Sequence, residues 1–104
     1  MDLKDLHEHY KEYLNKTVEL EGWIKNHRKQ AYFGFIDFND GTCFNNIQVV
    51  YTNDLNNFDS ISELRIGSAV KVIGTLIESE GSGQSYEIKA SDVVLIGGVD
   101  DDYP

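Results

Sequence analysis

Apolar residues recur at helical spacing at the start of the chain. The positions that share this spacing are Leu3, Leu6, Tyr10 and Leu14. Asp2 precedes them, and aspartate is one of the residues preferred at a helix N-cap. Because residues three or four apart lie on one face of a helix, the pattern predicts an amphipathic helix over about residues 2 to 14. We expect its apolar face to pack on the core and to close one end of the domain.

After this segment the apolar period changes to two, which is typical of a strand with one buried face. Val18, Leu20 and Ile24 alternate with charged residues. Gly22 interrupts the run, and a glycine inside a strand often marks a bulge or a bend, which a small barrel requires. Trp23 faces outward on this alternation unless a bulge turns it inward, and we interpret it as a structural residue.

A hairpin is predicted in the middle of the chain. The aromatic run at residues 33 to 38 leads through a turn signal at residues 39 to 42 into an apolar run at residues 47 to 51. Alternation separates two faces of these strands. The side chains expected inside are Ile36, Phe38, Ile47, Val49 and Tyr51. The side chains expected outside are Phe33, Phe35, Asp37, Gln48 and Val50.

A short helix is predicted next, over residues 54 to 64, with Asp54 as its cap. Two more strands follow, at about residues 68 to 78 and at residues 85 to 90 with 93 to 96, separated by a flexible loop at 81 to 83. This order predicts an all-β fold: a five-stranded OB-fold Greek-key barrel with an N-terminal helix and a short helix between strands three and four. We assign residues 1 to 98 to this domain.

Composition limits how the domain can bind a ligand. Its 104 residues are enough for one hydrophobic core and too few for two. The formal net charge of -9 argues against a protein that holds nucleic acid by phosphate neutralisation alone. Most acidic residues lie near the two ends, whereas Lys25, His27, Arg28 and Lys29 form a basic cluster. Any nucleic-acid site is therefore expected to be local.

Several other kinds of site and location are disfavoured. No apolar run approaches the roughly 20 residues that a membrane-spanning helix needs, and the N-terminus does not resemble a secretory signal, so we expect a cytoplasmic protein with no membrane partner. Cys43 is the single cysteine, which excludes an internal disulfide and a cysteine-based zinc site. His7 and His9 stand two apart on a predicted helix and point in different directions. We expect no catalytic residue, metal or cofactor in this domain.

The outer face of the predicted hairpin carries an aromatic ring beside an amide. An exposed Phe35 can stack on an unpaired base for about 1 to 3 kcal/mol, while Gln48 can hydrogen-bond the base edge. Arg28, in the predicted turn between the first two strands, can reach a phosphate or a base. Each residue also has an ordinary alternative. The Phe35 ring would be covered by a neighbouring loop or helix, Gln48 would be a solvated strand residue, and Arg28 would be a solvated charge. Lys25 has the same alternative as Arg28.

The segments at residues 22 to 28, 33 to 41 and 47 to 50 together resemble the N-terminal domain of class IIb aminoacyl-tRNA synthetases. Within that group the Phe-Gly-Phe-Ile segment and the Asn-Asp-Gly turn followed by Cys-Phe are most similar to the asparaginyl branch. The resemblance covers nearly the whole chain and continues into residues 102 to 104. It departs from the family at residues 29 to 32, where relatives often have a more polar loop.

The resemblance implies that the chain binds the anticodon loop of tRNA(Asn). Phe35 would stack on the middle base, a uridine, Gln48 would hydrogen-bond its edge, and Arg28 would assist at the base or its phosphate. Glu87 matches a position near a flanking anticodon base, and Lys25 belongs to the basic cluster beside these residues. In this reading the domain by itself is not an enzyme.

The resemblance also implies a longer parent protein. Residues 99 to 104 would begin a linker to a catalytic domain that is absent from this chain. That domain would bind ATP and Mg²⁺ and would hold a homodimer together.

Three alternatives remain open. A general single-stranded DNA- or RNA-binding OB module would show little base preference, and a protein-binding OB module would use Phe35 to anchor a partner side chain. An aspartyl-tRNA synthetase would carry a closely similar domain, because the two anticodons share their first two letters. An RNA hairpin in which the middle uridine is changed to cytidine separates an anticodon reader from the first two alternatives.

Overall fold

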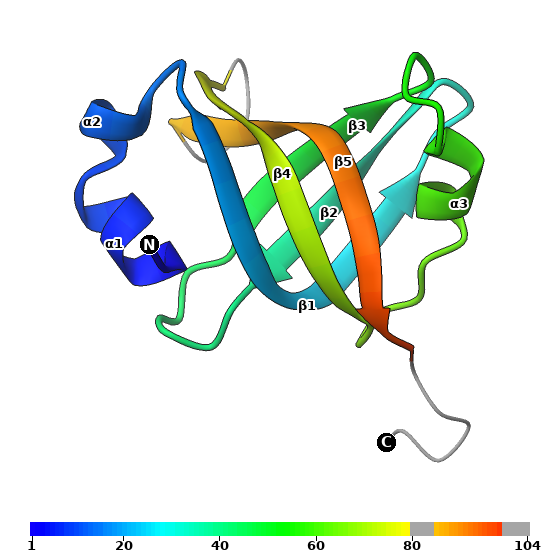
Figure 1. The fold of residues 1–104 in the computed structure, drawn as a ribbon, viewed down its shortest axis with the longest axis horizontal. Coiled ribbons are helices and arrows are strands. Elements are labelled where there is room, and N and C mark those ends of the chain that lie inside the picture. Colours follow the sequence, from blue (N-terminus) through cyan, green and yellow to red (C-terminus); the bar gives the residue numbers. More distant parts are fainter. Residues whose placement is uncertain (80–84, 99–104) are drawn as a thin grey trace.

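A closed barrel of five strands forms the body of the protein (Figure 1), which a computed structural model describes at residues 1–79 and 85–98. The strands are β1 (Thr17–Lys29), β2 (Phe33–Asn39), β3 (Ile47–Thr52), β4 (Ala69–Glu78) and β5 (Tyr86–Gly97). Their order around the barrel is β1-β2-β3-β5-β4. β3 pairs with β5 in parallel, whereas β1 is antiparallel to both β2 and β4. The predicted five-stranded barrel is confirmed. The predicted loop at 81 to 83 and the predicted linker at 99 to 104 lie outside the described residues.

The barrel interior is apolar because each strand turns alternate side chains inward. Burial alternates from residue to residue throughout β3, and in β4 as far as Ile77. The five interior side chains predicted for the hairpin have no exposed surface; they are Ile36, Phe38, Ile47, Val49 and Tyr51. Leu3 and Leu6 from the N-terminal helix and Ile61 from the helix after β3 complete the core at its ends.

β1 bends so that it pairs with β4 along its first half and with β2 along its second. The irregularity predicted in this strand lies at Lys25, where the register with β2 shifts, and not at Gly22. Gly22 has a different reason to be glycine, since a Cβ there would lie 2.5 Å from the Asn39 carbonyl oxygen. Trp23 keeps its outward orientation and is 47% exposed.

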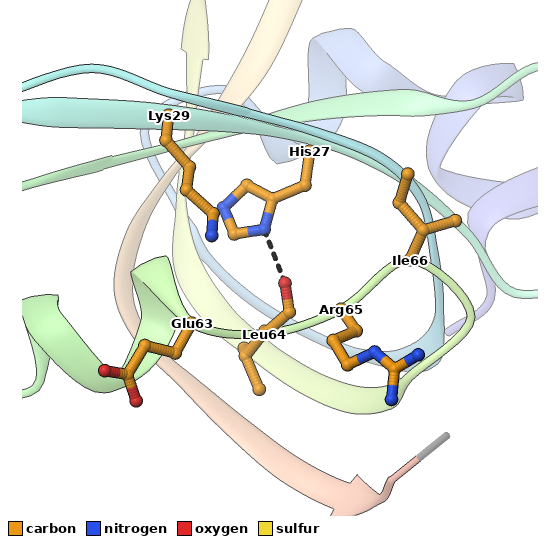
Figure 2. A pocket seen from close by; sticks show the side chains of 6 residues that line it. All are labelled: His27, Lys29, Glu63, Leu64, Arg65 and Ile66. Carbon is orange, nitrogen blue, oxygen red and sulfur yellow. Dashed lines mark hydrogen bonds between the residues drawn. The ribbon is translucent and has the colours of Figure 1, made fainter. Parts of the chain in front are cut away.

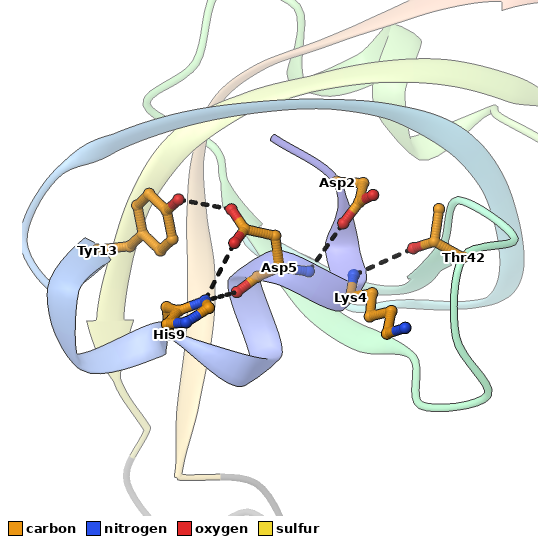
Figure 3. A network of polar contacts seen from close by, with 6 residues as sticks. All are labelled: Asp2, Lys4, Asp5, His9, Tyr13 and Thr42. Carbon is orange, nitrogen blue, oxygen red and sulfur yellow. Dashed lines mark hydrogen bonds and ion pairs between the residues drawn. The ribbon is translucent and has the colours of Figure 1, made fainter.

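The single N-terminal helix predicted over residues 2 to 14 is instead two short helices, α1 (Leu3–Glu8) and α2 (Tyr10–Tyr13). Asp2 caps α1 as predicted, accepting a hydrogen bond of 2.8 Å from the Asp5 backbone N–H. The Asp5 carboxylate then bridges the break, because it accepts from the Tyr13 hydroxyl at 2.6 Å and contacts the His9 Nδ1 at 3.0 Å (Figure 3). Continuation of the helix is prevented where Leu14 forms a bridge to β4.

The helix between β3 and β4 is also shorter than predicted. α3 (Phe58–Ser62) begins after Asn57, so Asp54 is not its cap. Asp54 instead accepts a hydrogen bond from the Thr52 hydroxyl in the turn that leaves β3. α3 lies against one end of the barrel (Figure 1) and buries Ile61 there.

Within the two described stretches of chain, no helix has both the length and the apolar character needed to span a bilayer.

Candidate nucleic-acid interface

Four of the five predicted site residues lie in a row across the outside of neighbouring strands. Arg28 on β1 is the direct cross-strand partner of Phe35 on β2. Gln48 on β3 is diagonal to Phe35, because it pairs with Asp37 two residues further along β2. Glu87 on β5 lies beside Gln48, because the adjacent residues Val49 and Ile88 are partners. Arg28 therefore belongs to β1, which continues to Lys29, and the prediction that it lies in a turn was wrong.

These four side chains form a continuous set of contacts. The guanidinium carbon of Arg28 lies 5.1 Å from the centroid of the Phe35 ring, which is within cation-π range. Its Nη2 donates a 3.0 Å hydrogen bond to Gln48 Oε1. Gln48 Nε2 in turn donates to Glu87 Oε1 over 3.4 Å. We call Arg28, Phe35, Gln48 and Glu87 the outer row.

Phe35 is neither in the core nor fully exposed. Its ring is half-buried on the outer face, where the ring of Phe33 meets it edge-on at 5.3 Å and 81°. Phe33 itself is 38% exposed. The predicted outward orientation of both rings is confirmed, and together they form an aromatic surface beside the amide of Gln48.

The charges around the outer row alternate in sign rather than adding up to a basic patch. Arg28 contributes one cation, whereas Glu87 and the neighbouring Asp37 contribute two carboxylates when ionised. Neutralising many phosphates would require several clustered cations. The arrangement instead offers a ring face for stacking and directed hydrogen-bond groups for a base edge.

The inner face of the same strands holds the outer row in place. Gly34, next to Phe35, has no side chain, and the Tyr51 ring occupies the space where a Cβ would be. The Tyr51 hydroxyl donates a 2.6 Å hydrogen bond to His27 Nε2, and His27 Nδ1–H donates at 2.8 Å to the Leu64 carbonyl. These bonds connect the end of β1 to β3 and to the segment after α3, so Arg28 extends from a fixed backbone.

His27 is kept neutral by this packing. Burial lowers the pKa of its imidazole below the usual value, with Lys29 acting in the same direction, while the hydrogen bond to Leu64 opposes the shift. A carbonyl only accepts hydrogen bonds, so Nδ1 carries the proton and Nε2 is free of it, as the bond from Tyr51 requires.

A pocket of about 360 Å³ opens beside His27 at the barrel end near α3. Figure 2 shows its lining residues, which are His27, Lys29, Glu63, Leu64, Arg65 and Ile66. Because side chains alternate along a strand, His27 points to the side of β1 opposite Arg28. Both ring nitrogens of His27 are already hydrogen-bonded within the protein, so the ring belongs to the packing of the barrel end.

The set of contacts in the structure differs from the predicted site at two residues. Lys25 is exposed at the register shift of β1 and makes no hydrogen bond or ion pair to the outer row in the described part of the chain. Ser79 was not predicted, yet its hydroxyl donates a 2.8 Å hydrogen bond to Glu87 Oε1. A serine at the end of a predicted strand carries no functional signal, and only the pairing of β4 with β5 brings it to Glu87.

Known proteins share this fold and much of this sequence. The sequence pattern of the tRNA anticodon family, described as an OB-fold nucleic acid binding domain, matches residues 18–96. The asparagine–tRNA ligase of Acholeplasma laidlawii is 47% identical over 93 residues, covering 88% of this chain and 20% of the relative. That of Desulfitobacterium hafniense is 39% identical over 102 residues, covering 98% of this chain and 22% of the relative.

A solved structure shows the same fold. The crystal structure of asparaginyl-tRNA synthetase from Pyrococcus horikoshii matches with a TM-score of 0.74 at 23% identity, over 85% of this chain and 21% of that one. The chain thus spans about a fifth of the length of these relatives. It belongs to the tRNA anticodon family of OB-fold nucleic acid binding domains, in the form that asparagine–tRNA ligases carry.

Proposed function

We propose that this chain reads the anticodon of tRNA(Asn) for an asparagine–tRNA ligase, with the outer row as its RNA-binding surface. The observation that supports this most directly is the contact set itself, in which an aromatic ring, a guanidinium and an amide lie together on the outside of the sheet. These are the groups that stack on an unpaired base and hydrogen-bond its edge.

Each member of the outer row has a distinct task in this proposal. Phe35 stacks on the middle base of the anticodon, a uridine, and Phe33 supports the ring from its edge. Gln48 hydrogen-bonds the Watson-Crick edge of that base. Arg28 lies over the Phe35 ring, so it is within reach of the stacked base or of its phosphate. Glu87 lies on the side of a flanking anticodon base.

The remaining activities belong to the longer protein in this proposal. The relatives are asparagine–tRNA ligases about five times as long as this chain, and a ligase of this kind activates its amino acid with ATP and Mg²⁺. We assign that chemistry, and the contacts of a homodimer, to a catalytic domain outside this chain. The protein is then expected in the cytoplasm, where tRNA is aminoacylated.

The proposal is tested by titrating the chain with an RNA hairpin that carries the asparagine anticodon loop. Weak, salt-sensitive binding is expected, because the net charge is -9 and one domain reads few nucleotides. A second hairpin in which the middle uridine is replaced by cytidine should bind more weakly. Nanomolar affinity would contradict the expected weakness of the isolated domain.

The other outcomes of the same titration identify the competing functions. Equal binding to both hairpins and to unrelated single-stranded DNA would indicate a general single-strand-binding module. No binding to any nucleic acid would indicate a surface for a protein partner.

A further inference from the structure

We propose that Glu87, held by Ser79, is a positioning residue that fixes the orientation of the Gln48 amide and thereby makes the site select uracil over cytosine. The inference rests on the proposed function of the outer row. It assigns a specificity role to Ser79, which lies outside that row, and it gives Glu87 a task at the middle base.

Arg28 and Glu87 require opposite hydrogen-bonding groups of the Gln48 amide. A guanidinium can only donate hydrogen bonds, and an ionised carboxylate can only accept them. Arg28 therefore has to face the amide oxygen, at 3.0 Å, and Glu87 has to face the amide nitrogen, at 3.4 Å. Rotating the amide by half a turn would place oxygen against carboxylate and N–H against guanidinium. One orientation satisfies both neighbours, and the other satisfies neither.

Glu87 can hold the amide only if it is itself held. Its Oε1 accepts a 2.8 Å hydrogen bond from the Ser79 hydroxyl. Ser79 is anchored beside the last paired residues of β4, where its N–H donates at 3.1 Å to the Ser85 carbonyl. Glu87 pairs with Ile77 across the same two strands and is half-buried. The carboxylate is therefore positioned from two directions, by its strand and by Ser79.

A fixed amide distinguishes the two pyrimidines because their edges differ in polarity at N3. Uracil presents a donor at N3 beside an acceptor at O4, whereas cytosine presents an acceptor at N3 beside a donor at N4. Pairing an amide with uracil puts the amide oxygen at N3, and pairing it with cytosine puts the amide nitrogen there. An amide that is free to rotate accommodates either base. For a base held in one position on Phe35, a fixed amide accommodates only uracil.

An amide has the capacity for this double role. Its oxygen carries two lone pairs and its nitrogen two N–H groups, and Arg28 and Glu87 each engage one of them. Orientation and reading therefore use different hydrogen-bonding groups of one side chain.

The test compares the two hairpins with variants of the full 104-residue chain. The wild type should prefer the uridine hairpin by about tenfold, in the range of one good base-edge pair. Glu87→Gln replaces the carboxylate with a group that both donates and accepts, so the preference should fall to within about twofold. Ser79→Ala should lower the preference partly, and Ser79→Thr, which restores the hydroxyl, should recover it.

A matched control separates orientation from charge. Glu19→Gln makes the same charge change on the exposed outer face of β1, opposite Ile73 of β4. It should leave the ratio of the two affinities at the wild-type value, even if both affinities rise because the chain is less acidic. Thermal melts of all variants show whether a lost preference reflects lost folding.

A second readout needs no RNA. The side-chain amide of Gln48 should have a heteronuclear NOE close to that of the β3 backbone in the wild-type chain, and a lower one in Glu87→Gln. A mobile Gln48 amide in the wild type would overturn the inference, as would an unchanged uridine preference in a folded Glu87→Gln chain. A wild type that binds both hairpins equally would instead overturn the proposed function, and the inference with it.

Discussion

Gly34 and Phe35 are adjacent, yet each serves a different side of the sheet. At Gly34 the backbone of β2 lies so close to the Tyr51 ring that a Cβ would overlap it. Phe35 points the other way and meets the guanidinium of Arg28 on the outside. A substitution at one of them therefore tests the packing of the barrel, and a substitution at the other tests the binding surface.

We expect Gly34→Ala to destabilise the fold by about 1 to 3 kcal/mol, which is typical of overpacking a tight site. The Tyr51 ring would have to move, and its hydrogen bond to His27 would move with it. Chemical denaturation measures the loss. Gly97→Ala is the matched control, because the nearest atom to its added Cβ would be 3.9 Å away. An equal loss in both variants would contradict this explanation.

We expect Phe35→Ala to weaken binding of the anticodon hairpin by about 1 to 3 kcal/mol through the loss of stacking. The melting temperature should change little, since the ring lies outside the core. Fluorescence titration and a thermal melt give the two quantities separately. A large loss of thermal stability with normal RNA binding would show that the ring is mainly structural.

At the scale of elements, the fold shifts the pKa values of two histidines in opposite directions. Burial lowers the pKa of His27 at the end of β1, so the unfolded chain takes up this proton more readily than the folded one. Hydrogen bonds to the Asp5 side chain and backbone raise the pKa of His9, between α1 and α2, so here the folded chain binds the proton more tightly. Linkage then gives the two residues opposite effects on stability.

The pH windows of the two histidines meet near pH 6.5, the usual pKa of the side chain. The contribution of His27 is present above that pH and is lost as the pH falls through its lowered pKa. The contribution of His9 is present below it and is lost as the pH rises through its raised pKa. Carboxylates whose pKa is lowered, such as Asp40, contribute throughout this range and lose their contribution only at more acidic pH.

We therefore expect the free energy of unfolding to decline as the pH falls from about 6.5 toward 5, and we expect His27→Asn to reduce this decline. The asparagine amide can still donate to the Leu64 carbonyl but does not titrate. Urea denaturation at a series of pH values measures the effect. His9→Asn is the control, because it should alter the pH dependence above 6.5 and leave the acidic decline in place.

At the scale of the whole molecule, charge and fold favour recognition of a few bases over extensive contacts to the phosphate backbone of the RNA. The net charge is -9, and the outer row contains one cation, Arg28, and one carboxylate, Glu87, with Asp37 beside them. Binding of a single-stranded ligand releases counterions, so the logarithm of the association constant falls with the logarithm of salt concentration. The slope is about -0.7 for each phosphate contacted. A domain that contacts only one to three phosphates should therefore bind in a salt-sensitive way, but with a moderate slope.

We expect the logarithm of the hairpin association constant to fall with the logarithm of salt concentration with a slope no steeper than about -2. Arg28→Ala should make the slope shallower by up to about one. Titrations across a salt series measure both. A wild-type slope near -5 would indicate extensive phosphate contacts and would contradict the base-reading surface.

The periodicity of the sequence was sufficient to predict the barrel and to assign the inner and outer faces of its strands. Ile36 and Phe38 inside, with Phe35 and Gln48 outside, follow from the fact that a strand turns successive side chains to opposite faces. Element ends were predicted less well. The break at His9 and the start of α3 at Phe58 coincide with contacts of Asp5, Leu14 and Asp54 that local pattern does not report.

The sequence by itself determined which residues face the solvent and which chemistry each can perform. Only the tertiary structure decided which of them meet. Arg28, Phe35, Gln48 and Glu87 come from four strands, and Ser79 directly follows the remaining strand, β4. Closing the barrel brings β5 beside β3 in parallel, so residues 39 positions apart in the chain share a hydrogen bond. The physical reason is that periodicity is a local property of the backbone, whereas strand register is set by packing the whole core.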